Sequence, residues 1–167
     1  LVFFFTSVKN RFHLPRQGGA LLVARYDISF RAKSVLNVEA KKVVARLAAG
    51  LINDGDMIFV DAGTTTLEMA PFLNRKRGIT VITHSTQLVH VLDEPSLNVI
   101  LLGGKYRPDI LELVGPMTLM AGQQFHGYTA FLGANAVSMD TGASCTDMDS
   151  SHVCAMAVRN ADSVVLL

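Results

Sequence analysis

The sequence predicts an α/β protein built on a doubly wound, largely parallel sheet. Apolar, strand-like runs alternate with segments able to form helices, which is the order expected when helical crossovers join parallel strands. Hydrophobic residues make up 50% of the 167 residues and charged residues 17%, a balance that suits a sheet covered on both faces. Successive strand-like runs also end in polar or glycine-rich turns, and in a parallel sheet such turns lie along one edge.

The predicted elements begin with a helix over residues 37–51, which has an apolar stripe, Asn37 as its N-cap and Gly50 near its end. Further helices are predicted over 66–74, 86–93, 116–124 and 149–161. Pro71 must lie near a first helical turn, where its missing N–H costs least. The predicted strands are Met57–Val60, Ile79–Ile82, Leu97–Leu102, Thr129–Leu132 and Val164–Leu167.

Composition and charge argue against a nucleic-acid-binding, metal-binding or membrane protein. The net charge of +1 offers no electrostatic argument for nucleic acid, and the basic cluster Arg75–Arg77 is typical of a solvated turn. Cys145 and Cys154 lack metal-ligand spacing, so we predict no metal and expect free thiols in a reducing cytosol. The apolar start Leu1–Phe5 is too short to span a bilayer and has no charges before it, so we predict no membrane role and a cytoplasmic protein.

The stretch Asp61–Thr66, reading Asp-Ala-Gly-Thr-Thr-Thr, follows the first predicted strand and precedes a helix. A strand, a short Gly/Thr loop and a helix start together favour phosphate, because unpaired backbone N–H groups and the positive end of the helix dipole face the ligand. The alternative is an ordinary turn in which Asp61 or a threonine only caps the helix. This segment alone leaves both interpretations open.

Four such turns follow consecutive predicted strands and favour a shared anion site. Their hydroxyls, glycine amides and cations converge on one rim of a parallel sheet. The nucleotide-binding patterns Gly-x-x-x-x-Gly-Lys-Ser/Thr and Gly-x-Gly-x-x-Gly are both absent, so we predict no cofactor. The four turns are Asp61–Thr66, Thr83–Ser85, Gly103–Arg107 and Gly133–Asn135.

In this order the turns resemble the effector-sensing domain of the DeoR family of bacterial transcriptional repressors. That resemblance implies the fold of ribose-phosphate isomerases and coenzyme A transferases, and a site for phosphorylated sugars or polyols that relieve repression. It extends beyond the turns to Gly18–Ala20, Ser29–Phe30, Asn37–Lys41, Leu101–Leu102, Leu113–Pro116 and Ala130–Leu132.

The resemblance implies that Gly63–Thr66 hold the phosphate and that the other turns complete the pocket. Some roles stay open: Asp61 either bonds the ligand or fixes its own loop, and His84 either contacts a hydroxyl or caps an element. Lys105 and Arg107 either neutralise phosphate or lie in water. The candidate ligand-binding residues are Asp61, Gly63, Thr64, Thr65, Thr66, Thr83, His84, Ser85, Gly103, Gly104, Lys105, Arg107, Gly133, Asn135 and Asp149, with no catalytic or metal-binding residue.

The chain departs from the family pattern at three places. Residues 1–16 contain nothing like the family's winged helix-turn-helix, so we expect operator DNA to be bound only by the intact protein. His84 stands where the family often has Asn, and Cys154, which we expect to be a small core hydrophobe, where it usually has Lys. Relatives continue beyond the position of Leu167, so we predict a fragment truncated at both ends. The predicted domains are 1–16, an unmatched segment; 17–36, a linker and end of the wing; and 37–167, the sensor, truncated at its C-terminus.

Two functions from different classes fit the sequence. The first is a non-enzymatic, sugar-phosphate-sensing domain of a DeoR-type repressor of a sugar or polyol catabolic operon, with a homo-oligomer as the expected assembly. The alternative is a sugar-phosphate isomerase-like enzyme on the same fold, which needs a base and a partner that stabilises an enediolate. Asp61 or Asp149 offers a base, but Cys154 replaces the obvious cationic partner, which favours the sensor.

Overall fold

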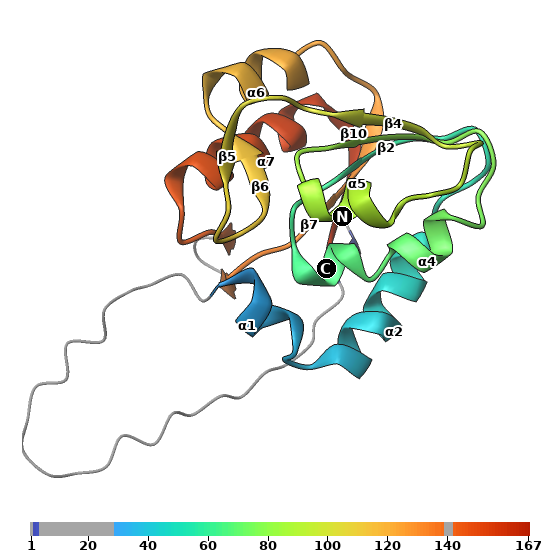
Figure 1. Cartoon of the computed structure of the whole chain (residues 1–167), viewed down its shortest axis with the longest axis horizontal. Coiled ribbons are helices and arrows are strands. Elements are labelled where there is room, and N and C mark those ends of the chain that lie inside the picture. The colour runs from blue at the N-terminus through green and yellow to red at the C-terminus, as the bar shows by residue number, and fades with distance from the viewer. Residues whose placement is uncertain (1, 4–28, 139–141) are drawn as a thin grey trace, which may run out of the picture.

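A six-stranded parallel sheet forms the centre of the computed structural model, which describes residues 2–3, 29–138 and 142–167. The strand order is β1-β10-β7-β2-β3-β4, and each neighbouring pair is parallel (Figure 1). The predicted doubly wound α/β class is therefore confirmed. The strands are β1 Val2–Phe3, β2 Met57–Val60, β3 Thr80–Thr83, β4 Asn98–Leu101, β7 Tyr128–Leu132 and β10 Ala161–Leu166.

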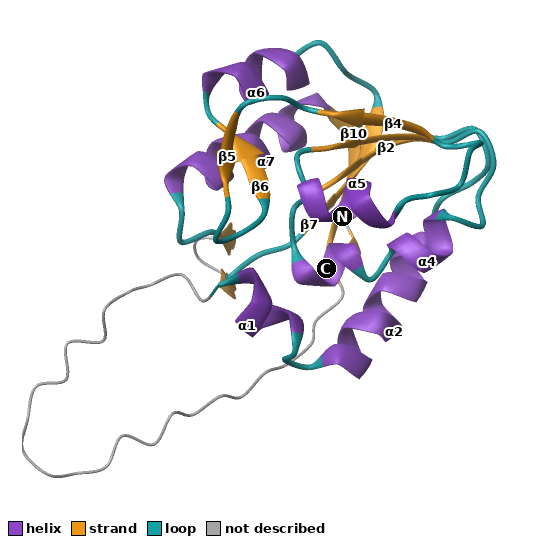
Figure 2. Cartoon of the chain, in the orientation of Figure 1, coloured by secondary structure: helices purple, strands orange, loops and turns teal. Residues whose placement is uncertain are grey.

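Helices cover the sheet and connect its strands (Figure 2). The prediction of one helix over 66–74 was wrong, because that stretch forms α3 and α4 with a break between them. Pro71 explains the break: it has no N–H to continue the ladder and lies in the first turn of α4. Among the described residues no helix has the length and apolar character needed to cross a bilayer. The helices are α1 Phe30–Ser34, α2 Val38–Ala49, α3 Thr64–Leu67, α4 Ala70–Leu73, α5 Thr86–Val91, α6 Pro116–Gly122 and α7 Met148–Asn160.

The central strands β2, β3 and β7 are buried on both faces of the sheet, as their continuous apolar runs require. Along β2, Ile58 and Val60 pack into the cluster that includes α2 and α4, whereas Phe59 packs into the cluster that includes α7. All three side chains are almost fully buried, and burying each contributes about 1.5–3 kcal/mol of transfer free energy. Two apolar layers therefore hold the carboxyl ends of the strands in fixed positions.

Two antiparallel hairpins extend from the sheet and were not predicted. They are β5 Lys105–Arg107 with β6 Glu112–Val114, and β8 Ala136–Ser138 with β9 Gly142–Ser144. Strands of three residues are too short to show a period of two in the sequence. The β6 strand also runs beside the turn after β3, where Leu113 N–H donates to the carbonyl of His84 at 2.8 Å. This contact brings the β5–β6 hairpin to the end of the sheet.

The N-terminal part of the chain contributes more structure than the sequence indicated. Val2 and Phe3 pair in parallel with Val165 and Leu166, so the segment assigned no strand period begins with β1. A strand of two residues is below the length at which a pattern can be recognised. The helix α1 also lies inside residues 17–36, predicted as linker. The rest of the predicted N-terminal segment and the Gly18–Gly19 break lie outside the described residues.

Candidate functional site

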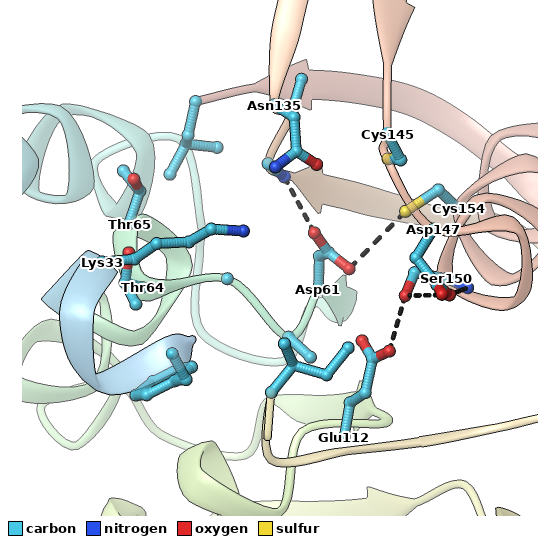
Figure 3. Close-up of a pocket in the computed structure, with 17 residues that line it drawn as sticks. Lys33, Asp61, Thr64, Thr65, Glu112, Asn135, Cys145, Asp147, Ser150 and Cys154 are labelled. Atoms are coloured by element: carbon cyan, nitrogen blue, oxygen red, sulfur yellow. Dashed lines mark hydrogen bonds between the residues drawn. The ribbon is translucent and has the colours of Figure 1, made fainter. Parts of the chain in front are cut away.

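A cavity of about 150 Å³ lies beyond the carboxyl ends of β2 and β7. These strands are neighbours, but the chain proceeds from β2 to β3 and β4 on one side, while β7 and β10 lie on the other. The strand order therefore reverses between β2 and β7, which is where open parallel sheets bind ligands. Figure 3 shows side chains from both walls of this cavity.

Asp61, directly after β2, lies on the cavity floor and accepts hydrogen bonds from several neighbours. Its Oδ2 accepts a hydrogen bond from Gly133 N–H at 3.0 Å, which joins the turns after β2 and β7. Its Oδ1 lies 3.0 Å from Nε2 of His84 and 3.6 Å from Sγ of Cys154. Because the Asp61 side chain is still 13% exposed, part of it remains available to a small molecule.

His84 is fully buried beneath Asp61, and both of its ring nitrogens face oxygen acceptors. Its Nε2 faces Asp61, and its Nδ1 lies 3.1 Å from the carbonyl of Leu113 and 3.8 Å from Oε2 of Glu112. Burial by itself lowers the pKa of His84, but the hydrogen bond and charge of Asp61, with the charge of Glu112, outweigh burial and raise it. The backbone nitrogen of Ala62 lies 3.3 Å from the same Nε2, and its N–H is also directed at the Asp61 carboxylate.

The pKa of Asp61 shifts in the opposite direction from that of His84. Burial alone raises the pKa of Asp61, but hydrogen bonds from His84, Gly133 and Ala62 hold the pKa below its usual value. Asp61 is therefore ionised at neutral pH and forms a buried ion pair with His84. The carboxylate oxygens of Asp61 therefore form the floor of the cavity. They accept hydrogen bonds, so they suit ligand hydroxyl groups better than a phosphate.

A second group of carboxylates forms one wall of the cavity. Glu112 on β6 accepts a hydrogen bond from Ser150 Oγ at 2.6 Å, and burial raises the pKa of Glu112 despite the charges of His84 and Arg107. Asp147 caps α7 by accepting from Ser150 N–H at 2.9 Å and pairs with Arg107. This wall therefore adds carboxylate acceptors. Arg107, which pairs with Asp147 and lies 4.0 Å from Glu112, partly neutralises their charge.

The opposite wall supplies donors. Thr64 and Thr65 begin α3, and within the described part of the chain their backbone N–H groups donate to no protein acceptor, as expected for a first helical turn. Lys33 of α1 extends along the same side (Figure 3). Of the described residues that line the cavity, Lys33 is the only lysine or arginine.

The cavity therefore has two chemically different ends. Backbone N–H groups, threonine hydroxyls and an ammonium at one end suit an anion, whereas carboxylates at the other suit hydroxyls. In the described segments no three His, Cys, Asp or Glu side chains are placed to hold a metal ion. The arrangement fits a small polyhydroxylated anion.

Residues 36–167 match the family model described as the DeoR C terminal sensor domain. The chain belongs to the DeoR family. This membership covers most of the chain and includes the turns after β2, β3 and β7. The predicted family is thus confirmed.

Similar DeoR-type proteins are named as transcriptional regulators or repressors. The chain is 30% identical over 165 residues to the uncharacterized HTH-type transcriptional regulator FruR of Bacillus subtilis, covering 97% of this chain and 66% of FruR. It is 35% identical over 138 residues to the lactose phosphotransferase system repressor of Lactococcus lactis, covering 81% and 54%. It is 33% identical over 156 residues to the repressor GlcR of B. subtilis, covering 90% and 59%. The chain therefore spans less than two thirds of these relatives.

The relatives are named as regulators or repressors and the matched family model describes a sensor domain, which bears out the non-enzyme prediction and does not favour the isomerase alternative. A solved D-ribose-5-phosphate isomerase in complex with phospho-erythronic acid has a similar fold, with a TM-score of 0.55 and 17% identity, covering 77% of this chain and 51% of that one. At this identity the likeness concerns the fold alone. It confirms the predicted isomerase-like architecture of the DeoR sensor.

The residues predicted to bind ligand fall into two groups in this DeoR domain. Those that line the cavity are Asp61, Gly63, Thr64, Thr65, Gly133 and Asn135. The turn after β3 lies beneath the cavity: His84 supports Asp61, the Thr83 hydroxyl donates to the carbonyl of Val60 at 2.7 Å, and Ser85 caps α5. Thr66 is buried, and its hydroxyl donates to backbone oxygens of the turn after β2. The ligand role of all these residues stays a prediction.

The Gly103–Gly104 turn has a structural reason of its own. Gly104 has φ +152°, and an added Cβ would lie 2.6 Å from the carbonyl oxygen of Val114 and clash with Thr118. The Thr118 hydroxyl donates to the carbonyl of Gly103 at 2.7 Å. Glycine at position 104 thus permits close packing of this turn on α6 and β6, and neither glycine lines the cavity.

The other charged residues of the prediction, Lys105, Arg107 and Asp149, lie around the cavity and not in its lining. Lys105 is exposed, and Arg107 supports the acidic wall through Asp147. Asp149 lies in the first turn of α7, where Asp147 supplies the cap. A phosphate contact by any of them would need a different arrangement of the β5–β6 hairpin or the start of α7.

Sequence reasoning missed several cavity residues because they come from elements without a recognisable motif. Lys33 lies on a helix inside the predicted linker, and Glu112 lies on a three-residue strand. Ser150 and Cys154 project from one side of α7. Cys154 had been expected to be a small core hydrophobe, but it lines the cavity and lies within 3.6 Å of Asp61.

Proposed function

We propose that this chain senses a phosphorylated sugar or polyol on behalf of a DeoR-type transcriptional repressor of a sugar or polyol catabolic operon. The observation that carries the proposal is the cavity at the strand-order reversal, with donors at one end and carboxylates at the other. Family membership adds the regulatory context. The name of the L. lactis relative, a lactose phosphotransferase system repressor, supports a link to sugar uptake.

The phosphate group belongs at the donor end in this proposal. Backbone N–H groups of Thr64 and Thr65 are oriented by the start of α3, and their hydroxyls add neutral donors. Lys33 adds a positive charge that strengthens binding of a dianion over a neutral sugar.

The hydroxyl groups of the ligand belong at the acidic end. Asp61 is ionised and accepts hydrogen bonds, and the Asn135 side chain lies beside it (Figure 3). A carboxylate that is already fixed by Gly133 and His84 needs no reorganisation when a hydroxyl binds. This end should therefore decide which sugar or polyol phosphate is accepted.

Signal transmission follows from the elements that meet at the cavity. The ligand would touch α1, α3, the turn after β7 and α7, so its binding favours the conformation in which these elements lie closest. Residues 17–36 would pass that preference to a DNA-binding domain in the intact protein, with residues 37–167 as the sensor. Operator binding and a homo-oligomeric assembly belong to the same proposal.

A thermal-shift screen tests the proposal. Sugar and polyol phosphates should raise the melting temperature more than their unphosphorylated forms, with inorganic phosphate as the reference for the donor end alone. A ligand present at about a hundred times its Kd adds about 2.7 kcal/mol to the free energy of unfolding. Calorimetric titration of the best compound then gives the Kd. Equal shifts for each phosphorylated and unphosphorylated pair would overturn the assignment of a phosphate site.

A further inference from the structure

The acidic end of the cavity carries more negative charge than the side chains around it neutralise. The carboxylates of Asp61, Glu112 and Asp147 line this end, and two basic side chains among the described residues contact them from outside the lining. His84 lies 3.0 Å from Asp61 through Nε2 and 3.8 Å from Glu112 through Nδ1, and Arg107 pairs with Asp147 and lies 4.0 Å from Glu112. Even with both basic groups charged, two cations face three carboxylates, so one negative charge is left for a ligand to neutralise.

One oxygen of Glu112 accepts no hydrogen bond from the described part of the chain. Oε1 accepts from Ser150 Oγ at 2.6 Å, whereas Oε2 faces Nδ1 of His84 at 3.8 Å, which is beyond hydrogen-bond distance. Glu112 is only 4% exposed, and it lines the cavity. A carboxylate removed from bulk water needs donors, so Oε2 is a position for a donor group of the ligand.

The Ser150 hydroxyl cannot supply the missing donor. It has one hydrogen, and its Oγ lies 2.6 Å from Oε1 of Glu112 and 3.0 Å from Oδ1 of Asp147, so the two carboxylates compete for that hydrogen. A ligand hydroxyl would add one hydrogen and no charge. An ammonium group adds three N–H donors and a positive charge without adding an acceptor, so it complements this wall better than a hydroxyl does.

We propose that the cavity takes a phosphorylated amino sugar, whose ammonium group binds Oε2 of Glu112 and the neighbouring carboxylates while its phosphate binds the donor end. This inference rests on the sensing function proposed above and names the ligand class within it. The uncompensated charge and the open oxygen of Glu112 carry it. The remaining hydroxyl groups of the sugar keep the contacts assigned to them above.

The pKa of Glu112 supports the same assignment. Burial and the negative charge of Asp61 raise this pKa. The charges of His84 and Arg107 and the hydrogen bond from Ser150 oppose the rise without cancelling it. A bound ammonium would add positive charge beside the carboxylate, so its arrival should lower the pKa of Glu112.

The test is calorimetry on the whole chain near neutral pH with matched sets of four compounds. One set contains glucosamine 6-phosphate, glucose 6-phosphate, glucosamine and glucose, and the corresponding galactose and mannose sets cover other arrangements of the hydroxyl groups. In the set that binds most tightly, the amino sugar phosphate should bind about 10- to 100-fold more tightly than the hydroxyl sugar phosphate, because hydrogen bonds to charged groups contribute about 1.5–3 kcal/mol.

The same compounds separate this inference from the sensing proposal. Comparison within each phosphorylated and unphosphorylated pair tests the phosphate site, and comparison within each amino and hydroxyl pair tests the ammonium site. Hydroxyl sugar phosphates that bind as tightly as their amino counterparts in every set would overturn this inference and leave the sensing proposal standing. No binding of any amino sugar phosphate at millimolar concentration would also overturn it.

Two variants of the β5–β6 hairpin locate the ammonium. Glu112→Gln keeps the size of the side chain and removes its charge, so it should reduce the preference for the amino sugar phosphate by about tenfold. Asp109→Asn makes the same change at an exposed position outside the lining and should keep the full preference. Equal preferences in the two variants would contradict the role of Glu112.

NMR of the wild-type protein tests the same role without a variant. The pKa of the Glu112 carboxyl should fall when the amino sugar phosphate binds and should fall less with the matched hydroxyl sugar phosphate. Equal changes with the two compounds would show that the ammonium does not bind at Glu112, and would overturn the inference.

Discussion

Nε2 of His84 lies 3.0 Å from Oδ1 of Asp61, and the His84 side chain has no exposure to solvent. The pair joins the turns after β2 and β3, and Gly133 N–H extends the same connection to the turn after β7. A buried ion pair costs desolvation free energy, and removing one partner is expected to destabilise the fold by about 3–5 kcal/mol. The turns that surround the cavity are thus joined through the contacts of Asp61.

Stability should depend on pH through this histidine. The pKa of His84 is raised in the folded state, so its contribution is complete below the ordinary pKa of about 6.5 and is lost as pH rises through the folded value. The pKa of Asp61 is lowered, so its contribution is complete above about 3.9 and is lost as pH falls through the folded value. We expect the His84–Asp61 contribution to be largest between about pH 4 and 6.5.

Urea unfolding from pH 5 to 9 measures this effect. The loss attributable to His84 should approach a slope of about 1.4 kcal/mol per pH unit between its unfolded and folded pKa values. Glu112 is the other carboxylate that faces His84, and its pKa is raised. Its contribution therefore lowers the free energy of unfolding as pH rises from about 4.3, so the pKa of Glu112 must be measured in the same experiment. His84→Asn should remove the slope above pH 6.5. NMR titration of the wild-type histidines supplies a check that needs no variant, and a His84 pKa at or below 6.5 would refute the ion pair.

The Ser150 hydroxyl should lower the pKa of Glu112. Its hydroxyl lies 2.6 Å from Oε1 of Glu112, and this hydrogen bond opposes the effect of burial on the pKa of Glu112. Ser150→Ala should therefore raise that pKa further, as read from the side-chain carboxyl carbon by NMR. Ser151→Ala, on the same helix, is the matched control and should leave it unchanged. A Glu112 pKa that responds equally to both variants would show that the hydroxyl is not its partner.

The two adjacent glycines after β4 should differ sharply in their tolerance of alanine. An added Cβ at Gly104 would clash with Thr118 and lie 2.6 Å from the carbonyl oxygen of Val114, so we expect a loss of about 3 kcal/mol. An added Cβ at Gly103 meets nothing within 4 Å, so Gly103→Ala should change the unfolding free energy by less than about 0.5 kcal/mol. Chemical denaturation measures both. Similar values for the two variants would contradict the close packing of Gly104 on α6.

Thr65 tests the donor end of the cavity. If its hydroxyl donates to a phosphate, Thr65→Val should weaken binding of the best compound in the ligand screen by about 10- to 100-fold, since hydrogen bonds to charged groups contribute about 1.5–3 kcal/mol. Thr129→Val on β7 makes the same change away from the cavity and should bind normally. Calorimetry with both variants decides the point. Unchanged affinity in the Thr65 variant would move the phosphate elsewhere in the cavity.

The architecture, and the turns at the centre of the candidate site, could be predicted from the linear sequence. Apolar runs such as Met57–Val60 were long enough to be read as buried strands, and alternation with helices required them to be parallel. The turns beginning at Asp61 and Gly133 are continuous in sequence, so their place at the strand ends followed directly. A sequence pattern is enough to predict a strand or a turn, because consecutive residues form it.

The linear sequence could not show which distant side chains line the cavity, or which of the predicted ones lie outside its lining. Lys33, Glu112 and Cys154 come from a short helix, a three-residue strand and a helix far along the chain, and packing alone brings them to Asp61. Packing also buries His84 under Asp61, outside the cavity lining, where the charges of Asp61 and Glu112 raise its pKa. Burial and charge depend on every neighbour in space, and a linear pattern records only the neighbours along the chain.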